Sequence, residues 1–291
     1  MENFVRRFVV FLKNLWPRRK PTIYRILFRH SDFRQLPEEH QLFFIRLAHI
    51  ADDLRHVFYL CVAAERGTQS RFSEERRLAL HQLLFGVRLI YSILYEGWNV
   101  IQSGWYAEVN GQVLGRTWAS RLSDEARQGL DLLGRYFGQT SLADTIRNKF
   151  AFHYDADQLR EPLANARWET DEIMAGRQSG NVFYPFAEEI RALALLQAAI
   201  PDQPGTLWSS TTTEADIQEA AKRLYKGYQR VHNAFETFAN DVLIKTLKSL
   251  PHKTEEFTPP RVTELSEMSP VLFVKEPSLD QAREMRARRS P

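Results

Sequence analysis

Cysteine is nearly absent from this sequence: Cys61 is the only one among 291 residues. A single thiol forms neither an intrachain disulfide nor a cysteine-based zinc site. This usage is typical of proteins that remain in a reducing compartment, so we expect a cytoplasmic location. Cys61 falls on an apolar helical stripe, which predicts a small, buried, hydrophobic side chain.

Long apolar runs are also missing from the N-terminal segment, residues 1–37, which is basic and amphipathic. Its longest unbroken apolar run covers residues 8–12, far below the roughly 18 residues that span a bilayer. The segment also lacks a signal-peptide cleavage pattern. We therefore expect no transmembrane segment. A helix docked on its own domain is favoured over one lying on a membrane surface.

The sequence lacks the loops of several well-known strand-based chemistries. It contains no glycine-rich phosphate loop, no Gly-x-Ser-x-Gly nucleophile motif and no Gly-x-Gly-x-x-Gly fingerprint. Its formal net charge of +3 is too small to indicate nucleic-acid binding by itself. These absences argue against nucleotide-dependent and hydrolase folds built on parallel sheets.

Apolar residues instead recur at steps of three and four along most of the chain, which predicts an all-α helical bundle over residues 38–250. Serines precede several of these periodic segments and predict N-caps. The expected helices cover about 38–67, 73–98, 123–137, 141–165, 183–200 and 213–250.

Two regions interrupt this pattern. Residues 103–118 contain Asn110-Gly111 between alternating residues, which predicts a small hairpin-like or irregular insertion. Residues 251–291 are rich in Pro, Glu, Ser, Lys and Arg, and end in the basic stretch "REMRARRSP". Because this segment has few apolar groups, it buries too little surface to offset the entropy lost on ordering. The composition therefore predicts a flexible basic tail.

The stretch "TIRNKFAFHYD" brings Arg147, Asn148 and His153 together in one expected helix. On a straight helix, His153 follows the apolar stripe. Arg147 then lies about 120° around the axis and roughly 9 Å along it from His153. Arg147 and His153 therefore meet only if the helix bends or a second copy of the chain contributes. The alternative is structural: a histidine packed between helices, and Arg147 paired with Asp144 at i,i+3.

"IRNKFAFHYD" resembles the signature of the HEPN superfamily of helical domains. That signature is an arginine, a polar residue that is commonly asparagine, and a histidine after four to six intervening positions. Arg147, Asn148 and His153, with five intervening residues, satisfy it. The resemblance implies an all-helical bundle of HEPN type. Many members are metal-independent endoribonucleases whose site forms across a homodimer, often of the toxin or defence kind. Others are RNA-binding, nucleotide-binding or scaffolding modules.

Under this resemblance the substrate is RNA and no cofactor is needed. His153 becomes the general base, because a pKa near 6.5 suits proton transfer at neutral pH. Arg147 becomes the clamp on phosphate oxygens, and Asn148 orients the phosphate or the imidazole. Lys149 and Arg160 are expected to hold the RNA backbone. The expected protein partners are a second copy of the chain and an antitoxin or regulatory protein.

Two other hypotheses remain. In a non-catalytic RNA-binding or protein-interaction module, the same motif stabilises an interface. In a metal-dependent bundle protein, His49, Asp53 and His56 provide ligands from one helical face, which also includes Asp52. That site needs further ligands from other helices, for which His81, Glu96 and His232 are the candidates. A solvated polar flank explains the same face without metal.

Overall fold

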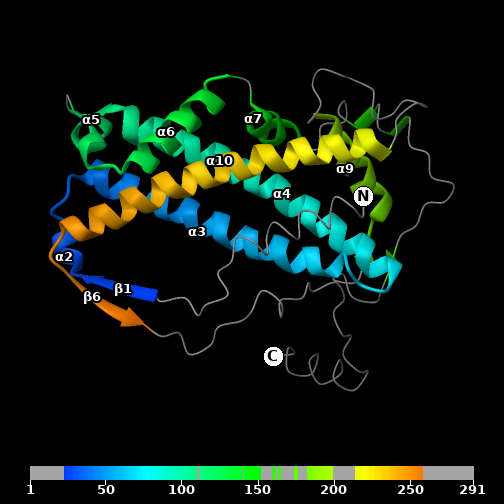
Figure 1. Cartoon of the computed structure of the whole chain (residues 1–291), viewed down its shortest axis with the longest axis horizontal. Helices are drawn as coiled ribbons and strands as arrows, with labels where there is room; N and C mark the ends of the chain where they lie inside the picture. The colour runs from blue at the N-terminus through cyan, green and yellow to red at the C-terminus, as the bar shows by residue number, and fades with distance from the viewer. Residues whose placement is uncertain are drawn as a thin grey trace, which may run out of the picture.

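The computed structural model describes residues 23–109, 112–139, 141–151, 159–160, 163–164, 174–175, 182–198 and 214–257. Within these ranges the chain forms the expected all-α bundle, with three small antiparallel strand pairs at its periphery (Figure 1). Leucine and aromatic side chains from the long helices make up its core, in which Leu47, Tyr91, Phe235 and Phe238 are fully buried.

Helices α3 (Glu38–Gly67) and α4 (Ser73–Ile101) form an antiparallel hairpin joined by a short link (Figure 1). Both helices have two glutamates in the first turn, where the helix dipole favours carboxylates. A Cβ added at Gly86 would lie 2.3 Å from Sγ of Cys61, so the two helices approach closely there. Cys61 is 1% exposed, which confirms the prediction of a buried thiol.

Helix α10 (Glu214–Ser249) crosses the hairpin, and α6 (Asp124–Phe137) packs along it (Figure 1). Ser123 caps α6 as predicted, because its Oγ accepts a hydrogen bond from the backbone N–H of Ala126 at 3.2 Å. The Ser123 N–H donates to Oδ2 of Asp241 in α10 at 2.9 Å. The cap therefore also joins the two helices.

The expected insertion is present between α4 and α6. It begins with a π-helical turn, η1 (Gln102–Tyr106), and continues with the hairpin β2 (Glu108–Val109) and β3 (Gln112–Val113). Helix α5 (Leu114–Trp118) and the 3₁₀ turn η2 (Ala119–Arg121) then lead to α6. Trp105 and Trp118 are 2% and 7% exposed, so the insertion is anchored in the core.

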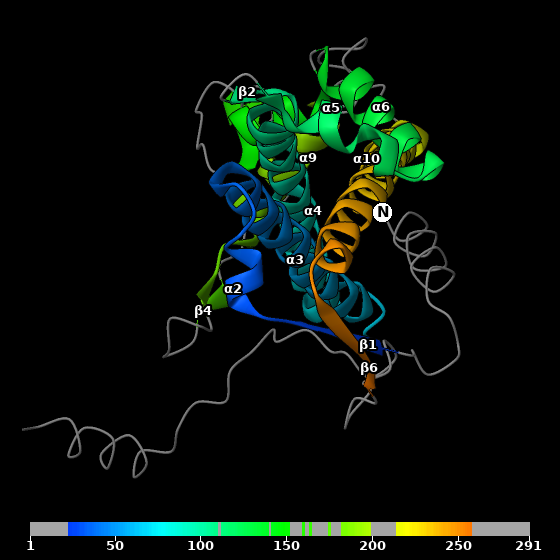
Figure 2. The ribbon, with the colours of Figure 1, turned by 90° about the vertical axis from the view of Figure 1, so that its left-hand side faces the viewer.

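The chain ends of the bundle differ from the expected division into a segment 1–37, a domain 38–250 and a tail from 251. Strand β1 (Ile23–Phe28) pairs antiparallel with β6 (His252–Phe257), and α2 (His30–Phe33) leads into α3 (Figure 2). The guanidinium of Arg25 lies 4.7 Å from the ring centroid of Phe257. Ordered structure therefore extends past both expected boundaries, while residues 1–22 and 258–291 lie outside the described part.

The expected helix 141–165 is described only in part, and within that part it is not α-helical throughout. Helix α7 (Leu142–Ile146) starts at the predicted cap, where Oγ of Ser141 accepts from the Asp144 N–H at 3.1 Å. It then passes into a π-helical turn, η3 (Arg147–Ala151). The strand pair β4 (Met174–Ala175) and β5 (Val182–Phe183) precedes α9 (Pro185–Ala198), which lies against α4, α7 and α10.

One described segment, α4 with η1 (Ser73–Tyr106), is long and apolar enough to cross a membrane by length and composition. Of its most apolar window, 67% is buried inside the protein. This is the burial that a central helix of the bundle requires.

Candidate functional site

Arg147 begins the π-helical turn, and its side chain reaches α4. Its Nε donates a hydrogen bond to Oε1 of Glu96 at 3.1 Å, and the two side chains are 39% and 47% exposed. The guanidinium carbon also lies 5.4 Å from the ring centroid of Tyr95, within cation–π range. Arg147 is therefore fixed at a surface between α4 and α7 while still open to solvent.

Asn148 extends this arrangement into a chain of four polar side chains. Its Oδ1 accepts from Nη1 of Arg147 at 2.8 Å, and its Nδ2 donates to Oδ1 of Asp144 at 2.8 Å. Asp144 thus pairs with Asn148 and not with Arg147, so the expected i,i+3 ion pair is wrong. The order Glu96, Arg147, Asn148, Asp144 defines what we call the Arg147 network.

The π-helical turn changes the geometry of the motif. In a π-helix each N–H bonds to a carbonyl five residues back, so the turn is wider than that of an α-helix. The α-helical rotation of about 100° per residue, from which the separation of Arg147 and His153 was predicted, therefore does not apply from residue 147 to 151. Ile146 and Phe150 are 0% and 5% exposed and hold the turn against the core. His153 itself lies outside the described residues.

The two expected RNA-contacting cations lie on the surface. Lys149 follows Asn148 in the π-helical turn, and its side chain is exposed. Arg160 is helical and exposed, in the short piece described at residues 159–160. Arg147, Asn148 and Lys149 thus share one turn. The structure does not join Arg160 to them, because the intervening chain is outside the described part.

The metal hypothesis receives no support within the described ranges. His49, Asp53 and His56 are all exposed on α3, and Asp52 forms an ion pair with Arg55 at 2.6 Å. No three His, Cys, Asp or Glu side chains in these ranges gather in a way that could hold a metal ion.

The three residues named as further ligands are engaged elsewhere. Glu96 binds Arg147. His232 is buried in α10, with its Nε2 3.6 Å from Oε1 of Glu236. His81 lines a separate cavity between α4 and α9.

Sequence reasoning missed the role of Glu96, because its partner lies 51 residues away. One sequence signal was nevertheless present. Glu96 is the only acidic residue between Arg76 and Ile101, a stretch that otherwise supplies a long, apolar helix. A lone carboxylate in such a helix points to a specific partner.

Comparisons with protein-family models, curated proteins and solved structures found no match for this chain. The assignment of the site therefore depends on the geometry of the Arg147 network and on the short resemblance around it.

Proposed function

We propose that this protein is a metal-independent endoribonuclease of HEPN type that acts as a homodimer. The observation that supports this most is the position of Arg147. It is held by Glu96 of another helix and by its neighbour Asn148, yet its side chain remains 39% exposed at the start of a π-helical turn. A guanidinium oriented in advance and open to solvent is suited to bind phosphate oxygens, and π-helical turns occur frequently at functional sites.

The proposed reaction uses the 2′-hydroxyl of the RNA as nucleophile. His153 takes the proton from that hydroxyl, whose oxygen attacks the adjacent phosphorus. The bond from phosphorus to the 5′-oxygen breaks, which leaves a 2′,3′-cyclic phosphate, and the leaving 5′-oxygen takes up a proton from water. Arg147 stabilises the charge that develops on the phosphate oxygens, and Asn148 keeps the guanidinium in place. Lys149 and Arg160 contact the RNA backbone.

This proposal includes a partner and a cellular setting. A toxin or defence nuclease in the cytoplasm needs an antitoxin or regulatory protein that restrains it. The Arg147 network is accessible to such a partner, since its members Glu96 and Asn148 are exposed, as is the neighbouring Lys149.

The direct test compares full-length wild-type protein with His153→Ala on single-stranded RNA in the presence of EDTA. We expect cleavage by the wild type and a loss of about 100-fold or more in the variant, the usual contribution of a general base. His49→Ala, a change of an exposed histidine on α3, is the matched control and retains activity. Equal cleavage by wild type and His153→Ala would contradict the proposal.

A non-catalytic RNA-binding or protein-interaction module is the second candidate. The same contacts favour it, because the Glu96 ion pair and the Tyr95 contact of Arg147 fasten α7 to α4. This candidate predicts that the wild type leaves RNA uncut. It also predicts that His153→Ala lowers the melting temperature or dissociates the dimer, both measurable by calorimetry and light scattering.

A further inference from the structure

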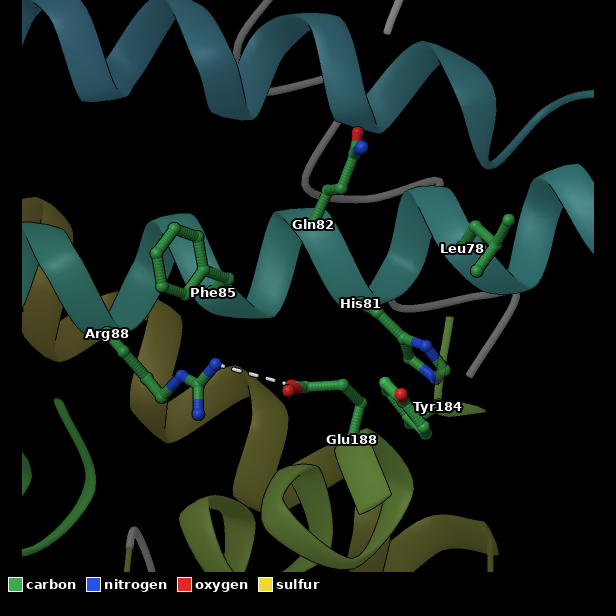
Figure 3. A pocket seen from close by; sticks show the side chains of 7 residues that line it. All are labelled: Leu78, His81, Gln82, Phe85, Arg88, Tyr184 and Glu188. Carbon is green, nitrogen blue, oxygen red and sulfur yellow. Dashed lines mark hydrogen bonds and ion pairs between the residues drawn. The ribbon is translucent and has the colours of Figure 1, made fainter. Parts of the chain in front are cut away.

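A cavity of about 200 Å³ opens between α4 and the start of α9, away from the Arg147 network (Figure 3). Its lining comes from one face of α4 and from Tyr184 and Glu188. An apolar cavity of ~150 Å³ is enough to bind benzene, so this space admits a planar ring. The rim includes Phe85 and Tyr184, which are 46% and 54% exposed.

An ion pair lies at the inner end of the cavity. Arg88 is 2% exposed, and its Nη2 lies 3.3 Å from Oε2 of Glu188 (Figure 3). The other carboxylate oxygen of Glu188 accepts from Nη1 of Arg191 at 3.1 Å. Burying a guanidinium costs free energy. Proteins in which apolar side chains replace a buried ion pair are often as stable as the original. Here Arg88 is buried while Glu188 remains 35% exposed. A buried guanidinium whose partner faces a cavity is therefore better explained by recognition than by stability.

The remaining walls are apolar or neutral. Leu78 is buried at one end, and Phe85 and Tyr184 offer flat faces on which a ring can stack. Burial lowers the pKa of His81 to about 4, assisted by nearby Arg77, so its imidazole is neutral at physiological pH. The cavity thus combines aromatic faces with one carboxylate and one guanidinium side by side.

A carboxylate accepts hydrogen bonds and a guanidinium donates them. A ligand that binds both groups therefore needs hydrogen-bond donors directly beside acceptors along one edge of a flat ring. Guanine has this edge: its N1–H and exocyclic amino group are donors, and its O6 and N7 are acceptors, which arginine commonly contacts. Adenine has an acceptor at the ring nitrogen where guanine has a donor, and would face the carboxylate unfavourably.

We propose that this cavity binds a guanine base, with Glu188 on its donor edge, Arg88 on O6 and N7, and Phe85 stacked on the ring. The base belongs either to a free guanine nucleotide or to an unstacked residue of RNA. Only the RNA source rests on the proposed nuclease function. Arg88 and Glu96 are eight residues apart on α4, about 12 Å along its axis and about 80° around it.

The test uses calorimetric titration of the full-length protein with GMP and with AMP. A second arm uses fluorescence anisotropy of two labelled oligoribonucleotides, identical except for guanine or adenine at one unpaired position. The His153→Ala protein is used for this arm so that RNA stays intact. We expect a preference for guanine of roughly tenfold or more in at least one arm, the discrimination typical of a bidentate base contact. Preference with GMP indicates a free nucleotide, and preference with the oligonucleotide alone indicates RNA.

Two variants link the preference to this cavity. Glu188→Gln replaces an acceptor oxygen by a donor and is expected to abolish the guanine preference. Phe85→Ala removes an exposed ring and keeps both charged groups of the ion pair, although it also removes the contact of that ring with Arg88, whose guanidinium carbon lies 5.4 Å from the ring centroid. It is expected to weaken binding of both bases by roughly tenfold. Glu125→Gln, a change of an exposed carboxylate on α6, is the matched control. Circular dichroism melts verify that each variant is folded.

The inference is overturned if neither GMP nor the guanine oligonucleotide is preferred, or if both variants bind like wild type. Loss of the nuclease function is a separate outcome. If the wild type leaves RNA uncut but GMP binds with the stated preference, the cavity is a nucleotide site and only the endoribonuclease proposal fails.

Discussion

Nε of Arg147 lies 3.1 Å from Oε1 of Glu96, although the two residues are 51 positions apart in the chain. The ion pair joins the π-helical turn to the centre of the bundle. Asp144 reaches the guanidinium only through Asn148, which hydrogen-bonds both side chains. Arg147, the residue of the motif that is best suited to bind phosphate, is thus positioned by Glu96 on another helix.

Replacing Glu96 by glutamine tests whether this positioning matters for activity. Both side chains are more than a third exposed, so the change should cost under about 1 kcal/mol in the free energy of unfolding. We expect RNA cleavage to fall roughly tenfold, since small displacements of a catalytic group are costly. Urea denaturation and initial cleavage rates measure the two effects. Glu125→Gln on α6 is the control, and an unchanged rate in Glu96→Gln would refute the positioning role.

Asn148→Asp places a second carboxylate one helical turn from Asp144. Like charges at i,i+4 destabilise a helix by about 0.2–0.5 kcal/mol. The new charge also repels phosphate, so RNA binding should weaken about tenfold and more strongly at low salt. Anisotropy titrations at two salt concentrations give the measurement. Asn240→Asp, on the exposed side of α10, controls for net charge and should leave binding nearly unchanged.

A mixed-subunit experiment decides whether the site is shared between two chains. Arg147→Ala and His153→Ala are each expected to be inactive. If one chain supplies Arg147 and the other His153, refolding the two variants together yields heterodimers with one intact site. About a quarter of wild-type cleavage should return, since random pairing makes half of the dimers mixed. No recovery, with dimers verified by light scattering, would place both residues in one chain.

Stability at acid pH should depend on His81. Its folded-state pKa is about 4 because of burial, against an ordinary value of 6.5. Between these two pH values the unfolded chain takes up a proton that the folded chain refuses, so stability falls as pH drops. The loss is on the order of 3 kcal/mol over that window. His232, whose pKa burial also lowers, acts in the same direction.

We therefore expect His81→Gln to make the free energy of unfolding less dependent on pH between 6.5 and 4. Denaturant melts at several pH values measure the slope. His49→Gln on the exposed face of α3 is the control and should keep the wild-type slope. Parallel curves for His81→Gln and wild type would contradict this interpretation.

Two glycines of α6 should respond to alanine in opposite directions. A Cβ at Gly129 would lie 2.8 Å from the backbone oxygen of Ala234 in α10, which has little room to move. Gly129→Ala should therefore destabilise by about 1–3 kcal/mol, as overpacking does. At Gly134 the nearest atom is a Trp98 ring carbon at 3.8 Å. Gly134→Ala should stabilise by about 0.5–1 kcal/mol through helix propensity. Equal effects in urea denaturation would disprove the close contact.

The sequence by itself determined the local features of the fold. Ser123 and Ser141 cap their helices because a side-chain oxygen and a backbone N–H two or three residues on need no distant partner. The periodic apolar stripes of α3, α4 and α10 correctly marked the buried faces, since side-chain direction follows the helical repeat. Asn110-Gly111 likewise predicted a hairpin, and β2 and β3 pair on either side of these two residues, which themselves lie outside the described ranges.

Only the tertiary structure decided the contacts between distant segments. The β1–β6 pair joins residues 23–28 to residues 252–257, and no pattern in either segment specifies the other. The change from α-helix to π-helix at Arg147 accompanies the packing of Ile146 and Phe150 in the core. Glu96 acquires its role because α7 crosses α4 at that point. Backbone hydrogen bonds and side-chain periodicity act over a few residues, whereas the Arg147 network forms only when separate helices pack together.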